Sequence, residues 1–163
     1  MFISSSLQKP HERTKQAFLL AFLIAVCMFL PFLVIDGGYF IFYGDYNVQQ
    51  IPFYKMAHNA VRSGNIFWSW TTDLGANFIG SYAFYLLGSP FFWITLIFPN
   101  AVVPFLMAPL FILKFSLASL FSYWFLCRFL NPDFALLGSL LYTFSGFSIY
   151  NIFFNHFHEA IVF

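Results

Sequence analysis

One lysine of this 163-residue chain stands alone in a long apolar run. Lys114 has 13 uncharged residues on each side. A lysine at the centre of a bilayer costs roughly 2.5–3.5 kcal/mol on insertion scales, so a lysine in such a place needs a reason. Two reasons are open: the ammonium meets a lipid phosphate, or the long side chain reaches the membrane surface without a partner.

A second set of ionisable residues lies earlier, in the polar stretch 36–81. Asp45 follows a glycine, and Gly-Asp is common in turns. A carboxylate in such a loop can also accept a proton from a hydroxyl group. Lys55 and Arg62 follow, and either can stabilise a developing anion. Asp36 directly ends an apolar run and is read as a boundary residue.

The sequence assigns no metal site. Asp36 and Asp45 lack the close spacing of a DxD motif, so whether a divalent cation takes part stays open. His156, His158 and Glu159 form a His-x-His-Glu sequence, which alone is too weak a signal to predict a metal.

The elements that must position these residues are membrane helices. Hydrophobic residues make up 61% of the chain and charged residues 8%, against roughly 25% charged in soluble domains. The net charge of +1 gives no reason to expect nucleic acid as a partner. Residues 17–35 are an uncharged run of 19, and about 20 apolar residues cross a bilayer. The basic tail 1–16 precedes it, which predicts a cytoplasmic N-terminus.

Residues 36–81 should therefore form a loop on the outer face. Within it, Pro52 and Gly64 mark the start and end of a predicted helix, 52–63. Lys55, Asn59 and Arg62 share one face of that helix and apolar residues another, which is typical of a helix in the membrane interface. A helix packed on a folded loop would give the same pattern. Trp68 and Trp70 are typical interface anchors.

The remaining apolar segments allow two topologies. In the first, 82–98, 101–127 and 134–155 all cross the membrane. In the second, 82–98 is re-entrant or interfacial, because Gly88-Ser89-Pro90 interrupts it, and 101–127 and 134–155 are the later spans. We favour the second, since it leaves Arg128 on the cytoplasmic side with the basic tail. Residues 156–163 begin another apolar run, which leads us to expect a truncated chain.

Several unusual sequences occur in an order that resembles a known family. GDYNVQQIPFYK (44–55), DLGANFIGSYAFYLLGSPF (73–91) and LLYTFSGF (140–147) resemble the start of the YfhO family of bacterial membrane proteins. The resemblance covers residues 17–160, and members of the family are several times longer. It implies an all-α, polytopic fold like the N-terminal part of a GT-C glycosyltransferase, in the bacterial cell membrane.

The resemblance also implies roles for particular residues. GT-C enzymes carry a catalytic carboxylate in the first outer loop, and Asp45 matches that position. The sugar would come from a polyprenyl-phosphate carrier and pass to a cell-envelope polymer such as lipoteichoic acid. Lys55, Arg62 and Lys114 would then bind the carrier phosphate. We expect the 163-residue chain alone to be inactive, because a GT-C active site is built from many helices.

Two other functions fit an apolar, helical chain. A transporter also carries charges within broken helices, but it should show an internal repeat, and these 163 residues contain none. A non-catalytic membrane scaffold would explain the helices and leave the GDYNVQQ loop without a reason.

Overall fold

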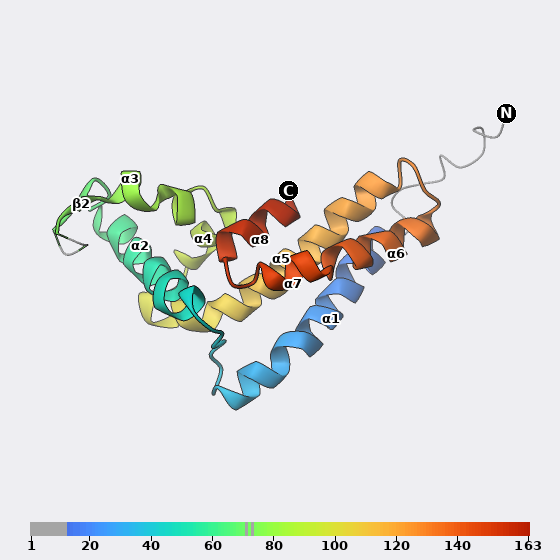
Figure 1. Cartoon of the computed structure of the whole chain (residues 1–163), viewed down its shortest axis with the longest axis horizontal. Helices are drawn as coiled ribbons and strands as arrows, with labels where there is room; N and C mark the ends of the chain where they lie inside the picture. Colours follow the sequence, from blue (N-terminus) through green and yellow to red (C-terminus); the bar gives the residue numbers. More distant parts are fainter. Residues whose placement is uncertain (1–12, 71, 73) are drawn as a thin grey trace. The chain divides into compact units, whose positions relative to one another are not determined.

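The computed structural model describes residues 13–70, 72 and 74–163, and these residues are mostly helical (Figure 1). The helical class that we expected is confirmed. The described residues also include one short antiparallel hairpin, β1 (Trp68–Ser69) and β2 (Ala76–Asn77), which we did not predict. Most of the predicted basic tail, residues 1–12, lies outside the described residues.

Two of the described helices are long and apolar enough to cross a membrane. The first is α1 (Thr14–Ile35), and the second runs over Asn100–Leu126. The latter combines the 3₁₀ turn η3 (Asn100–Val102) with α5 (Val103–Leu126). They overlap the predicted segments 17–35 and 101–127, because apolar composition over about 20 residues is a local and strong signal.

The chain divides into two compact units, and each is described by itself. Unit 1 contains Met1–Pro31, Phe111–Ile152 and His158–Phe163, and unit 2 contains Phe32–Leu110 and Phe153–Phe157. In unit 1, the first part of α1 packs on the second part of α5 and on α6 (Pro132–Thr143), as Figure 1 shows.

Close packing in unit 1 depends on small residues of α1. Ala17, Ala21 and Ala25 are fully buried and recur every four residues, so they form one face of the helix. Ala17 belongs to a buried cluster with Tyr123 and Ala135. The hydroxyl of Ser119 donates a hydrogen bond of 3.1 Å to the carbonyl of Ala17.

The predicted segment 134–155 is not one continuous helix. α6 ends at Thr143, and α7 (Gly146–Tyr150) begins after a break. Ser145 makes the new start, because its hydroxyl accepts a hydrogen bond from the backbone N–H of Ser148. Neither helix is long enough to cross a bilayer alone, so a membrane span here stays a prediction.

In unit 2, the loop after α1 leads into the π-helical turn η1 (Tyr46–Gln50) and then α2 (Ile51–Ser63). α2 begins one residue before the predicted start at Pro52, and it ends at Ser63, the predicted last residue. Pro52 occupies its first turn, and Gly64 follows its end with a φ of 77°, the left-handed conformation that favours glycine.

The segment after the hairpin is broken into short pieces. α3 (Phe78–Tyr82), the π-helical turn η2 (Ala83–Leu87) and α4 (Pro90–Thr95) follow one another. Asn77 caps α3 and Ser89 caps α4, each through a side-chain oxygen that accepts a backbone N–H. The break at Gly88-Ser89 leaves no long helix over 82–98, and the re-entrant arrangement stays a prediction.

Candidate functional site

The lone lysine of the second candidate span has an ion-pair partner. Lys114 of α5 donates to the carboxylate of Glu159 in α8 (Asn155–Val162), with 2.7 Å between Nζ and Oε1. The lysine side chain is fully buried and that of Glu159 is 13% exposed. The ammonium also lies 5.3 Å from the ring centre of Phe111. A buried charge is tolerated when it is paired, so this pair explains the lysine without a lipid phosphate.

His158 lies beside this ion pair in unit 1. Its ring is fully buried and packs against Phe115, with ring centres 4.5 Å apart. Among the described residues, neither of its ring nitrogens has a hydrogen-bond partner. The same residues contain no group of three His, Cys, Asp or Glu side chains that could hold a metal ion.

Asp45 lies in unit 2, in a loop that the side chain of Asn47 closes. The amide oxygen of Asn47 accepts a hydrogen bond of 3.1 Å from the N–H of Phe42, and its amide nitrogen donates to the carbonyl of Phe42. The Asp45 side chain is half-buried at the start of the following helical turn. These hydrogen bonds join residues on either side of Asp45 and so close the loop that carries it.

A glycine allows the same loop to approach an aromatic ring that is far from it in the sequence. Gly44 has a φ of 55°, and a Cβ placed on it would lie 2.7 Å from Cε2 of Phe153. The ring of Phe153 also stacks on that of Tyr43, with centres 4.8 Å apart. Only glycine combines this backbone conformation with so close an approach. Phe153 therefore supports the turn that carries Asp45.

The residue after Asp45 is a fully buried tyrosine. Tyr46 packs edge-on against Phe40, with ring centres 5.2 Å apart. Burial, with a smaller contribution from the neighbouring Tyr54, raises the pKa of Tyr46 well above its usual range. Tyr46 therefore stays neutral and anchors the loop.

The two cations of α2 differ in their surroundings. The side chain of Lys55 is exposed. Arg62 is also exposed, and its Nη1 donates a hydrogen bond of 3.1 Å to the carbonyl of Phe98. That bond uses one of the five guanidinium N–H donors.

The carbonyl of Phe98 accepts a second hydrogen bond, from a histidine of α2. His58 is fully buried, and its Nε2 donates to that carbonyl at 2.8 Å. The amide of Asn100 adds a bond of 2.7 Å to the carbonyl of Lys55. These three bonds attach α2, which carries both cations, to the turn at 98–100.

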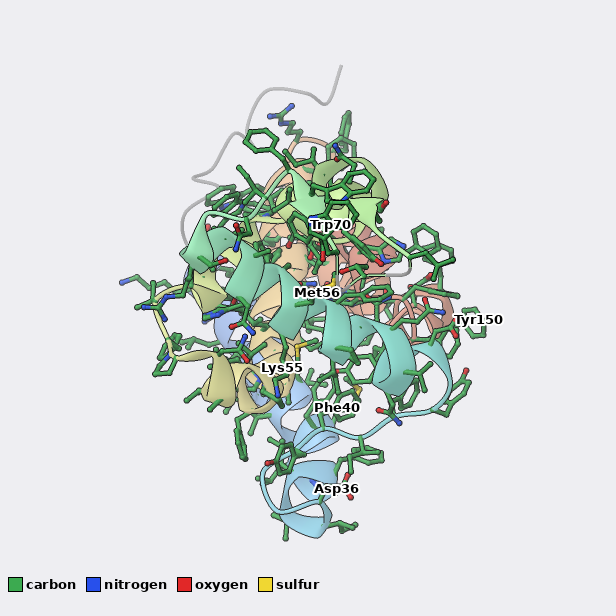
Figure 2. All side chains as sticks on the ribbon, turned by 90° about the vertical axis from the view of Figure 1, so that its left-hand side faces the viewer. Asp36, Phe40, Lys55, Met56, Trp70 and Tyr150 are labelled. Atoms are coloured by element: carbon green, nitrogen blue, oxygen red, sulfur yellow. The ribbon has the colours of Figure 1, made fainter. Side chains whose placement is uncertain are left out.

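Three of the four predicted site residues share unit 2, and the fourth belongs to unit 1. Asp45 directly precedes the continuous helical stretch of η1 and α2 that carries Lys55 and Arg62. Asp36 follows the end of α1, away from Lys55 on α2 (Figure 2), and this agrees with its reading as a boundary residue.

Sequence reasoning missed the supporting residues Glu159, Asn47 and Phe153. Of the three, only Asn47 is of a residue type common in turns, and nothing in the sequence points to its hydrogen bonds with Phe42.

The comparisons with known proteins agree with the composition. The family model described as "Bacterial membrane protein YfhO" matches residues 17–163. Neither the curated proteins nor the solved structures gave a match. The match covers nearly the whole chain and includes most of the first candidate span, all of the second, the Asp45 loop and the Lys114–Glu159 pair. The chain therefore belongs to the YfhO family of bacterial membrane proteins.

Proposed function

We propose that this chain is part of a membrane glycosyltransferase that acts on the outer face of the bacterial cell membrane. It would be a multi-pass protein with its N-terminus in the cytoplasm. The enzyme would transfer a sugar from a polyprenyl-phosphate carrier to a cell-envelope polymer such as lipoteichoic acid. The observation that carries the proposal is the Asp45 loop, which follows the first candidate span and is supported by Asn47 and Phe153.

The chemistry needs a base and an anion-binding group. The hydroxyl oxygen of the acceptor attacks the anomeric carbon of the donor sugar, and the bond from that carbon to the phosphate oxygen breaks. Asp45 would take the proton that the hydroxyl loses. The carrier phosphate leaves as an anion, and a positive charge near it lowers the barrier.

The exposed cations of α2 suit this second role. Lys55 has an exposed ammonium, and Arg62 keeps most of its donors for a ligand. Lys114 is engaged with Glu159, so it could bind phosphate only if that ion pair opened. We therefore propose Lys55 and Arg62 as the principal phosphate ligands and Lys114 as a secondary one.

One observation favours transport as a second candidate. An ion pair within a membrane helix is typical of proton and ion pathways as well as of enzymes. A transporter would need Lys114 and Glu159 for its activity and would tolerate the loss of Asp45.

The test is sugar transfer by the complete protein in membranes, from a radiolabelled polyprenyl-phosphate sugar to isolated cell-envelope polymer. Asp45→Asn keeps the size of the side chain and removes the base, so the rate should fall about 10²–10⁴-fold. Asp36→Asn is the control and should transfer at nearly the normal rate. Normal transfer by Asp45→Asn would exclude the base assignment, and loss of activity in Asp36→Asn instead would move it to that residue.

A further inference from the structure

Unit 2 contains a cavity that the proposed chemistry does not use. It lies between α2 and the hairpin of β1 and β2, and it has a volume of about 550 Å³. Small-molecule sites have volumes of ~300–1,000 Å³. Its lining includes Asn59, Ser63, Asn65, Trp68, Trp70 and Phe78.

Two indole rings form an aromatic wall on the hairpin side. Trp68 and Trp70 have ring centres 5.5 Å apart and planes inclined by 69°. Trp68 is 48% exposed and Trp70 is 81% exposed, so their faces remain open to a ligand. Gly75 lies against both rings, because a Cβ on it would be 3.1 Å from Trp68 and 3.5 Å from Trp70. The close approach of Gly75 therefore supports the position of both indoles.

Short polar side chains form the opposite edge. Asn59 and Ser63 come from the exposed side of α2, and Asn65 follows the end of that helix. The amide of Asn65 donates a hydrogen bond of 3.2 Å to the hydroxyl of Ser63. Amides and hydroxyls both donate and accept hydrogen bonds, as the hydroxyl groups of a ligand also do.

Charge is missing from the described lining of this cavity. No Lys, Arg, Asp or Glu occurs among the lining residues that the structure describes. In Figure 2, Trp70 lies to one side of α2 and Lys55 to the other. A phosphate, a carboxylate or a nucleotide would need a cation here, so the lining suits a neutral ligand.

We propose that this cavity binds a neutral sugar ring. A pyranose has an apolar face of C–H groups, which suits an indole face, and an edge of hydroxyl groups, which suits amides and serine hydroxyls. This assignment rests on the proposed function, in which a sugar ring is the group that is transferred. Exposed indoles that only anchor a protein at the membrane surface need neither the cavity nor the adjacent amides.

The test uses the purified 163-residue chain in a detergent without a sugar head group. Saturation-transfer NMR is recorded with the methyl glycosides of glucose, galactose and N-acetylglucosamine, and inorganic phosphate serves as a charged competitor. We expect saturation of the ring C–H protons of at least one glycoside, with no competition from phosphate. Trp70→Ala should weaken binding roughly three- to ten-fold, and Asn59→Leu should weaken it about ten-fold.

Two control variants make the result specific. Phe67→Ala removes an adjacent, 67% exposed aromatic ring that does not line the cavity, and it should bind normally. Asp45→Asn should also bind normally while the complete protein loses transfer. Binding without any transfer by the complete protein would leave the sugar site standing and remove the proposed function.

Three outcomes would overturn the assignment. In the first, no glycoside receives saturation. In the second, binding is equal in the wild type, Trp70→Ala and Asn59→Leu. In the third, phosphate displaces the glycoside. If Trp70→Ala lowered only the partition of the chain into phosphatidylglycerol vesicles, with no glycoside bound to the wild type, the indoles would be membrane anchors.

Discussion

Lys114 and Glu159 lie 45 positions apart in the sequence, yet their side chains form an ion pair of 2.7 Å in which the ammonium is completely buried. The pair joins the second candidate span to α8 within unit 1. Desolvating two charges is expensive, and their attraction and hydrogen bond offset that cost only while both are present. Loss of either side chain would therefore leave the other charge buried without its partner.

The first prediction follows from that dependence. Lys114→Met should destabilise the protein by about 3–5 kcal/mol, because it leaves the carboxylate of Glu159 without its counter-charge. The double variant Lys114→Met with Glu159→Leu should be clearly more stable than Lys114→Met alone. The measurement is thermal unfolding in detergent, analysed as a double-mutant cycle. Additive effects in the cycle would show that the two residues do not interact.

The same double variant tests the role of Lys114 in binding phosphate. If the lysine serves only the ion pair, the double variant of the complete protein should keep a normal KM for the polyprenyl-phosphate donor. A raised KM with restored stability would instead make Lys114 a ligand of the carrier.

The second prediction concerns the bracing of the Asp45 loop. Asn47→Ala removes both hydrogen bonds to Phe42, so Asp45 should lose its fixed position. We expect kcat for sugar transfer to fall about ten-fold or more with little change in KM, since misplacement of a catalytic group acts on the chemical step. Val48→Ala, at a neighbouring side chain that is 67% exposed, is the control. Equal rates for the two variants would separate Asn47 from catalysis.

The third prediction compares two glycines that share a left-handed backbone. Gly64→Ala meets no atom within 4 Å, so it should cost only the backbone strain, roughly 1–2 kcal/mol. Gly44→Ala carries the same strain and also a Cβ that would lie 2.7 Å from Phe153. We expect its unfolding temperature to fall further than that of Gly64→Ala. Adding Phe153→Leu should recover part of the difference, and no recovery would show that the ring does not contact the turn.

The fourth prediction concerns orientation in the membrane. In a background without Cys27 and Cys127, a cysteine at position 63 should react with an impermeant thiol reagent in intact cells. A cysteine at position 5 should be protected, because the basic residues before the first candidate span predict a cytoplasmic N-terminus. The opposite labelling pattern would put the Asp45 loop inside the cell and exclude transfer on the outer face.

Local signals made several elements predictable from the sequence. Pro52 and Gly64 gave the bounds of α2 to within one residue, because helix ends are set by nearby backbone requirements. Segment 134–155 shows the limit of a count of charges. Its apolar run is uninterrupted, but the hydroxyl of Ser145 starts a new helix within it. A polar side chain that caps a helix does not register as a break in hydropathy.

The partners of the candidate site could not be predicted in the same way. Glu159 lies in a His-x-His-Glu sequence that suggested, at most, a weak ligand cluster, and only the fold brings it to Lys114. Likewise, nothing near Gly44 in the sequence points to Phe153. Such contacts depend on long-range packing. Hydrophobic periodicity indicates that a helix is present without identifying the residues that it meets.

The buried alanine face of α1 bears differently on two free energies, that of inserting the helix into the bilayer and that of packing it on its neighbours. Close approach of the neighbouring helices depends on the small side chains of Ala17, Ala21 and Ala25. The hydrophobic effect does not drive helices together within lipid, because the lipid tails are equally apolar. Replacing Ala21 with leucine would make α1 more apolar and so favour its partition into the bilayer, while the larger side chain would obstruct its fit in unit 1. Substitutions on this face should therefore act on the fold through shape rather than through solubility in lipid.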